Sequence, residues 1–196
     1  MQTLSVYKMC AAALLIAIGF VIPAFSPVKI VLEPASYTLA SHVAIFIAMF
    51  ISPFIAVVVS LGTTLGFFVG GFPLVIVLRA ATHVVFALVG AYYLRYHRDL
   101  INRPVRIQGF SFLIGVLHSV CETAVVTWFY FGGGGGLSEM FYQQGFVRSV
   151  VLLTGVGYLV HSMVDFAIAL VVVKALSAQG TLFSVLVYPR RDAGKG

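Results

Sequence analysis

The sequence predicts an all-α integral membrane protein, a bundle of six transmembrane helices with both termini in the cytoplasm. Of its 196 residues, 61% are hydrophobic and only 9% are charged, whereas a soluble domain carries roughly 25% charged residues. The mean hydropathy of +1.06 indicates the same class. The apolar residues also form long runs, and a helix needs ~20 of them to cross a bilayer. These observations favour a multi-pass protein of the cell membrane.

Prolines, glycines and charged residues divide the apolar sequence into six segments. The predicted helices are 5–25, 39–51, 54–69, 74–96, 110–131 and 149–176. The first run is longer than the apolar core of a signal peptide, so we interpret it as a membrane helix. Pro53 separates the second and third helices, and five consecutive glycines, 132–136, follow the fifth as a flexible linker. We expect one membrane domain, 1–180, followed by a basic cytoplasmic tail, 181–196.

The basic residues predict the orientation of the helices. Most of them lie in two clusters, 95–106 and 190–195, of a chain with a net charge of +6. Cytoplasmic loops of membrane proteins carry an excess of Lys and Arg, which puts both clusters inside. Two helices lie between the clusters and four precede the first, so the N-terminus with Lys8 is also inside. We therefore expect contacts with the lipid bilayer and no nucleic-acid partner.

The last three helices contain ionisable residues, each of which costs about 2.5–3.5 kcal/mol to insert into a membrane. Six of them form three pairs with a spacing of four residues: Arg79 with His83, His118 with Glu122, and His161 with Asp165. This spacing puts both members of a pair on one helix face. Three polar stripes are buried at least cost when they face a common interior. The sequence therefore predicts a pocket in the outer half of the membrane.

Arg79 is the sharpest single candidate in this pocket. A guanidinium group cannot be deprotonated in a protein, so it needs an anion. It can pair internally with Glu122 or Asp165, bind a carboxylate on a ligand, or extend to the lipid headgroups. The histidines can likewise form hydrogen bonds within their own helices rather than bind a ligand.

Aromatic residues and the first outer loop complete the candidate site. Trp128, near the outer end of the fifth helix, can stack on a planar ligand or belong to an interfacial aromatic belt. The loop 26–38 is longer than two packed helices need and can act as a lid. The predicted ligand-binding residues are Arg79, His83, Glu122, Trp128, Tyr158, His161, Asp165, Tyr37 and His42.

Motifs for chemistry are absent from the sequence. It contains no HExxH metal motif, no GxxxxGK[ST] phosphate loop and no nucleophile elbow. We therefore expect no catalytic residues, no metal and no cofactor. Two alternatives stay open: an intramembrane enzyme that uses the histidines and carboxylates as acid–base groups or as zinc or cobalt ligands, and a carrier or channel that works alone. An inverted repeat would favour the carrier, and none is evident.

Several short motifs resemble one family of membrane proteins. The stretch 34–93 carries Ala40-Ser41-His42-Val43, Phe50-Ile51-Ser52-Pro53, Leu61-Gly62-Thr63-Thr64-Leu65-Gly66 and Gly71-Phe72-Pro73. Ala13 and Ala17 form an AxxxA pattern in the first helix. With the chain length and six helices, these features resemble the substrate-binding S-component of an energy-coupling factor (ECF) vitamin transporter. The sequence is most similar to the niacin type, with the pantothenate type next.

The resemblance implies a small water-soluble vitamin bound by the first loop and helices four to six. It also implies that Ala13 and Ala17 face a transmembrane coupling subunit, which joins two cytoplasmic ATPase subunits. Small residues one turn apart allow such close helix contact. Both candidate vitamins carry a carboxylate that suits Arg79, and the aromatic ring of niacin suits Trp128, so niacin is favoured. The chain departs from the family in its five-glycine linker and its basic tail.

Overall fold

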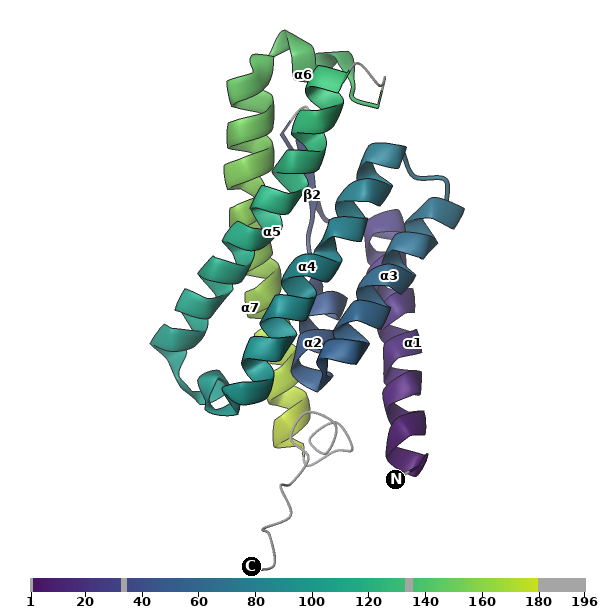
Figure 1. Ribbon diagram of the computed structural model, residues 1–196, viewed down its shortest axis with the longest axis vertical. Coiled ribbons are helices and arrows are strands. Elements are labelled where there is room, and N and C mark those ends of the chain that lie inside the picture. Colours follow the sequence, from purple (N-terminus) through teal and green to yellow (C-terminus); the bar gives the residue numbers. More distant parts are fainter. Residues whose placement is uncertain (1, 33–34, 133–135, 180–196) are drawn as a thin grey trace, which may run out of the picture.

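The computed structural model describes residues 2–32, 35–132 and 136–179 of the chain (Figure 1). Nearly all of these residues are helical, as the sequence predicts. The elements are α1 (Gln2–Phe25), β1 (Lys29–Leu32), β2 (Ala35–Thr38), α2 (Val43–Ile51), α3 (Pro53–Val69), α4 (Leu74–Tyr96), the 3₁₀ helix η1 (Arg98–Asn102), α5 (Pro104–Gly132), α6 (Glu139–Gln143), the π-helix η2 (Val147–Val156) and α7 (Gly157–Ala178). The predicted basic tail, 181–196, lies outside the described residues.

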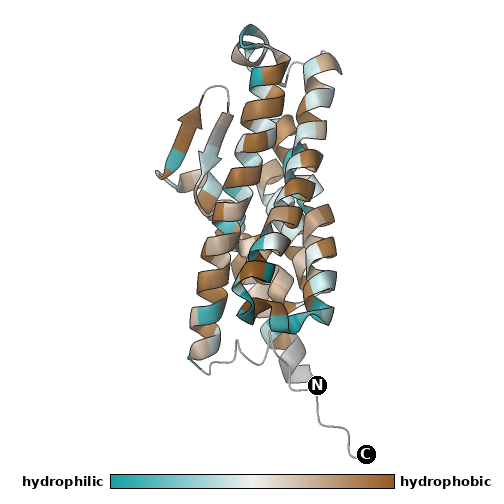
Figure 2. Cartoon of the chain, turned by 90° about the vertical axis from the view of Figure 1, so that its left-hand side faces the viewer, coloured by the Kyte–Doolittle hydropathy of each residue, from teal (hydrophilic) through white to brown (hydrophobic). Residues whose placement is uncertain are grey.

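Four helical segments are long and apolar enough to cross a membrane. They are Val6–Phe25, Leu74–Tyr96, Pro104–Gly132 and Val147–Ala178, the last of which joins η2 to α7. The apolar helix α3 has 17 residues, about 26 Å at 1.5 Å per residue. Apolar side chains are also exposed on the outside of the bundle, among them Leu14, Phe54 and Leu113, and Figure 2 shows hydrophobic residues, in brown, along the helices. The protein is therefore a multi-pass membrane protein.

The short helix α2 forms the centre of the apolar core. All nine of its residues are buried, and it contacts α1, α3, α4 and α7. Phe46 packs against Phe86 and Phe166, with ring centroids 5.4 and 5.3 Å away. A helix that is apolar on every side is expected to be buried in this way. Its position places the N-terminus of α2 inside the molecule, where the polar residues gather.

The first loop contains a β-hairpin that the sequence analysis did not predict. β1 and β2 pair antiparallel, with Ile30 opposite Tyr37. The side chains of β1 are exposed, whereas Ala35 and Tyr37 of β2 are buried. The hairpin thus lies at the side of the bundle with β2 against the helices (Figure 2).

The predicted start of the second helix is wrong, because a turn occupies residues 39–42 and α2 begins only at Val43. Ala40 in this turn has a φ of 66°. A left-handed conformation costs a residue with a side chain about 1–3 kcal/mol, so the surrounding structure must hold the turn in place. The contacts that hold it belong to the polar site.

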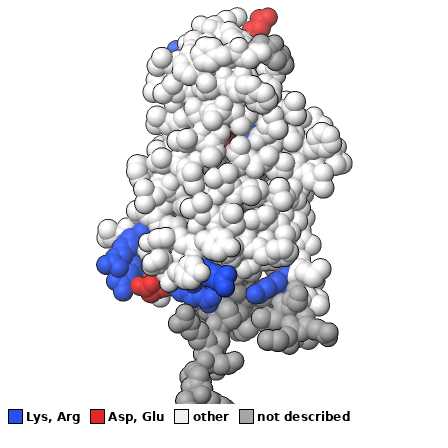
Figure 3. Space-filling model, in the orientation of Figure 1, with Lys and Arg blue, Asp and Glu red and all other residues white. Residues whose placement is uncertain are grey.

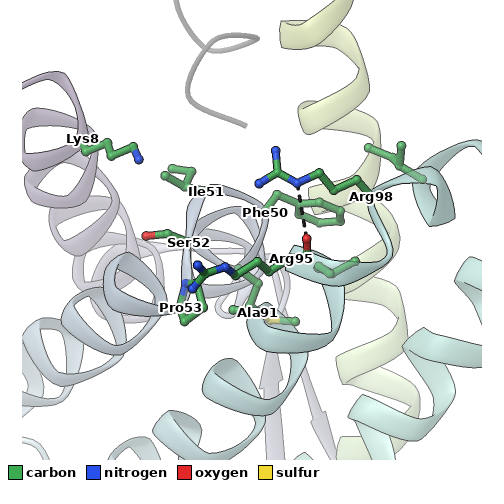
Figure 4. A pocket seen from close by; sticks show the side chains of 11 residues that line it. Lys8, Phe50, Ile51, Ser52, Pro53, Ala91, Arg95 and Arg98 are labelled. Carbon is green, nitrogen blue, oxygen red and sulfur yellow. Dashed lines mark hydrogen bonds between the residues drawn. The ribbon is translucent and has the colours of Figure 1, made fainter. Parts of the chain in front are cut away.

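The basic residues gather at one end of the molecule (Figure 3). At this end, a cavity of about 310 Å³ is lined by Lys8 of α1, by Arg95 and Arg98, and by Ser52 at the α2–α3 junction (Figure 4). Arg98 Nε donates a hydrogen bond to the carbonyl of Arg95 at 3.4 Å. The start of α1 and the α4–α5 connection therefore lie at the same end, which an even number of membrane crossings requires.

Candidate functional site

The polar stripes of α4 and α5 meet at the carboxylate of Glu122. Arg79 Nη2 donates to Oε2 at 2.9 Å, and His83 Nε2 lies 2.9 Å from Oε1. His118, one turn away on the same helix, is farther from Oε1 at 3.4 Å. The Glu122 side chain is 2% exposed. The predicted internal ion pair of Arg79 is thus present, and the shortest histidine contact joins two helices rather than two turns of α5.

Asp165 of α7 holds the turn that precedes α2. Its Oδ1 accepts the backbone N–H of Ala40 at 2.8 Å, and its Oδ2 accepts that of His42 at 2.9 Å. Oδ2 also lies 3.0 Å from His42 Nδ1 and 3.4 Å from His161 Nε2. A carboxylate at the N-terminus of α2 further complements the helix dipole. Asp165 therefore explains the strained turn, and both of its oxygens are occupied by protein donors.

Four imidazole rings pack together between these two carboxylates. The His42 ring centroid lies 4.8 Å from His83, 4.6 Å from His118 and 5.2 Å from His161. All four residues are buried. Three of them are ligand-binding residues predicted from the sequence, whereas His118 was predicted only as part of a polar stripe and, in the enzyme alternative, as an acid–base group or metal ligand. The structure joins all four, because the His42 turn inserts between α4, α5 and α7.

Two tyrosines cover the polar cluster on the hairpin side. The rings of Tyr37 and Tyr158 are 4.9 Å apart, and the Arg79 guanidinium lies 4.3 Å from the centroid of the Tyr158 ring. The Tyr37 hydroxyl donates to the carbonyl of Leu153 in η2 at 2.5 Å. A Cβ atom at Gly157 would collide with this hydroxyl. The lack of a side chain at residue 157 therefore makes room for Tyr37.

A cavity of about 210 Å³ opens beside Arg79 and Tyr158, and its other lining residues include Ala35, Pro73, Ile76, Val126, Ser138 and Phe141. Pro73 and Ser138 adjoin α4 and α6 at the end opposite the basic residues (Figures 1 and 3). Arg79 Nε is buried and has no hydrogen-bond partner. Pockets for drug-sized ligands measure roughly 300–1,000 Å³, so this cavity suits a smaller molecule with an anionic group.

Three predicted residues lie away from the cluster. The Trp128 side chain is 67% exposed on the outside of α5, where it fits the alternative of an aromatic residue facing lipid or the interface. At 100° per residue, six positions after Glu122 put Trp128 about 120° around the helix from the carboxylate. Ala13 and Ala17 are exposed on α1, so the face predicted to bind a partner is open.

The sequence was compared with known proteins. It is 42% identical over 172 residues to the niacin transporter NiaX of Lactococcus lactis subsp. cremoris (strain MG1363), covering 88% of this chain and 75% of that protein. The chain belongs to the NiaX family. No protein-family model and no solved structure matches the chain. Membership of the NiaX family confirms the resemblance found in the sequence, and it identifies the chain as a transport protein of the cell membrane rather than an enzyme.

Proposed function

We propose that the chain binds niacin in the outer cavity and serves as the substrate-binding S-component for uptake of this vitamin. The related niacin transporter supports this choice of ligand. Niacin is a pyridine ring with one carboxylate. The observation that carries the proposal is the buried Nε of Arg79, which has no hydrogen-bond partner beside the cavity. A guanidinium edge matches a carboxylate through two parallel hydrogen bonds, while the pyridine ring packs between Val126, Phe141 and Tyr158.

Calorimetric titration of the purified protein tests this proposal. Niacin should bind at least about 100-fold more tightly than nicotinamide, which has the same ring, because each lost charged hydrogen bond is worth about 1.5–3 kcal/mol. Equal affinity for the two compounds would contradict the role of the carboxylate. If pantothenate bound more tightly than niacin, pantothenate would be the ligand instead. Sealed right-side-out vesicles should bind niacin, whereas inverted vesicles should not.

The vesicle measurement also tests the orientation of the cavity that follows from the proposed topology of six crossings with both termini in the cytoplasm. In this topology, β2 and α2 together form the second crossing. Four extended residues of β2 span about 13 Å and nine residues of α2 about 14 Å, which with the turn approaches the ~30 Å hydrocarbon core. Non-helical backbone is tolerated at membrane depth where protein surrounds it, and β2 is covered by β1 and the bundle. The positive-inside rule places the basic end in the cytoplasm.

We further propose that uptake depends on ECF coupling through α1. Only 17% of the apolar window of α1 is buried, compared with 44% in each of the other long helices. Ala13 and Ala17 are exposed on this peripheral helix. Small side chains let a neighbouring helix approach closely where hydrophobicity alone gives no attraction. The face around these alanines is therefore the proposed contact for the transmembrane coupling subunit, which in turn joins two ATPase subunits.

Replacing Ala13 and Ala17 together with leucine should reduce niacin uptake by cells about 10-fold or more, because the larger side chains hold the partner helix away. Niacin binding to the purified variant should stay unchanged. Ala167→Leu on α7 is the matched control, since Ala167 is also exposed. Uptake of labelled niacin by cells and by reconstituted liposomes measures the first effect, and calorimetric titration of the purified variant measures the second. Uptake into liposomes without ATPase subunits would instead support a carrier that works alone.

A further inference from the structure

Four atoms suited to bind a metal converge beneath the vitamin cavity. These atoms, which all lie within 4.8 Å of one another, are one ring nitrogen from each of His42, His83 and His118 and one carboxylate oxygen of Glu122. All four residues are buried. They come from the turn before α2, from α4 and from α5, so the group forms only when the chain folds. With bonds of about 2.0–2.1 Å, ligands around a tetrahedral zinc ion are about 3.3 Å apart, so a small inward closure would complete the sphere.

Asp165 and Ser162 orient two of the histidine rings through contacts with their Nδ1 atoms. His42 Nδ1 lies 3.0 Å from Asp165 Oδ2, and His118 Nδ1 lies 3.1 Å from Ser162 Oγ. Histidines that bind metals usually donate their second ring N–H to a carboxylate or another acceptor in this way. The Nε2 atoms of both rings then remain for a ligand role. His118 Nε2 is indeed buried without a hydrogen-bond partner, 3.4 Å from Glu122 Oε1.

The charges of the buried cluster also favour a cation. With neutral imidazoles, the carboxylates of Glu122 and Asp165 exceed the single guanidinium of Arg79 by one negative charge. An uncompensated charge at membrane depth is costly. A divalent cation would leave one positive charge, which the carboxylate of a bound vitamin would neutralise. The metal would thus complement the vitamin that occupies the cavity above it.

We propose that His42, His83, His118 and Glu122 bind a divalent transition metal ion. Three imidazoles and one carboxylate oxygen match the tetrahedral preference of zinc. Glu122 has the two oxygens that this role needs, since Oε1 faces the histidines and Oε2 holds Arg79. The expectation of no metal rested on the lack of a compact motif such as HExxH, and a zinc or cobalt site of histidines and a carboxylate remained an alternative.

Cobalt titration of the full chain, in detergent and without niacin, tests the metal site. The protein should carry an affinity tag without histidine and should first be stripped with a chelator. We expect one Co²⁺ per chain, with the intense visible absorption of tetrahedral cobalt, and displacement of cobalt by Zn²⁺. His97→Ala is the matched control and should bind as the parent does, because His97 is exposed outside the cluster. His118→Gln should weaken binding about 100-fold or more.

A second variant keeps the test decisive if His118→Gln fails to fold. Ser162→Ala removes the partner of His118 Nδ1 and should weaken cobalt binding about 10–100-fold, the usual loss for a residue behind a metal ligand. The proposal is wrong if the parent binds no cobalt, if its cobalt shows only the weak absorption of an octahedral surface complex, or if both variants bind as the parent does. Because niacin is absent throughout, these outcomes do not depend on the proposed transport function.

Discussion

Replacing Arg79 with alanine should lower niacin affinity about 100-fold or more. The variant loses the guanidinium group of a residue that lines the cavity, and with it the two charge-assisted hydrogen bonds proposed for the ligand carboxylate, of about 1.5–3 kcal/mol each. It should also be less stable, because Glu122 would remain buried without its cation, which typically costs about 3–5 kcal/mol. Calorimetry with niacin and thermal unfolding in detergent measure the two effects separately.

The double variant Arg79→Ala/Glu122→Gln separates binding from stability. Removing the carboxylate as well as the guanidinium removes the charge that Arg79→Ala leaves without its cation, so the melting temperature should return towards that of the parent. Niacin binding should remain weak, because the missing group is the one that contacts the ligand. Arg79→Lys should give an intermediate affinity, since an ammonium keeps the charge but lacks the planar fork. If Arg79→Ala bound niacin as tightly as the parent, the proposed role of Arg79 would be wrong.

Helical periodicity explains how much of the site could be predicted from sequence. The spacing of four residues placed Arg79 and His83 on one face of α4. The cost of burying charge predicted that the three polar stripes would face a common interior, with Glu122 or Asp165 as alternative partners for Arg79. The shortest contacts between a histidine ring and a carboxylate, from His83 to Glu122 and from His42 to Asp165, nevertheless join different segments. Helix periodicity gives the face of a residue within one helix, but it does not specify how two helices rotate against each other.

The first loop shows where the sequence signal was ambiguous. Residues 39–51 are apolar except for Ser41 and His42, a composition that suggests a single helix. The first four residues nevertheless form a turn held by Asp165. That carboxylate lies far away in the sequence, so local composition could not indicate the turn. The strand β1, by contrast, had a usable signal. Its sequence Lys-Ile-Val-Leu is rich in β-branched residues, which favour strands.

Replacing Gly157 with alanine should displace Tyr37 and weaken niacin binding about 10-fold. The new Cβ would collide with the Tyr37 hydroxyl and lie 2.8 Å from its Cζ atom. Tyr37 cannot easily swing away, because it is buried in β2 and bonded to the Leu153 carbonyl. Overpacking of this kind costs about 1–3 kcal/mol. Movement of β2 would also disturb Ala35, which lines the cavity beside Arg79 where niacin is proposed to bind.

Gly90→Ala is the matched control for this prediction. A Cβ there meets the Met49 Cε atom, the end of a flexible side chain that can rotate away, so stability and niacin affinity should change much less. Tyr37→Phe combined with Gly157→Ala should recover part of the loss, because it removes the hydroxyl that collides. Thermal unfolding of these variants measures the change in stability, and niacin titration measures the change in affinity. If Gly157→Ala were as stable as the parent and bound niacin equally well, Tyr37 would not pack against Gly157 as the structure places it.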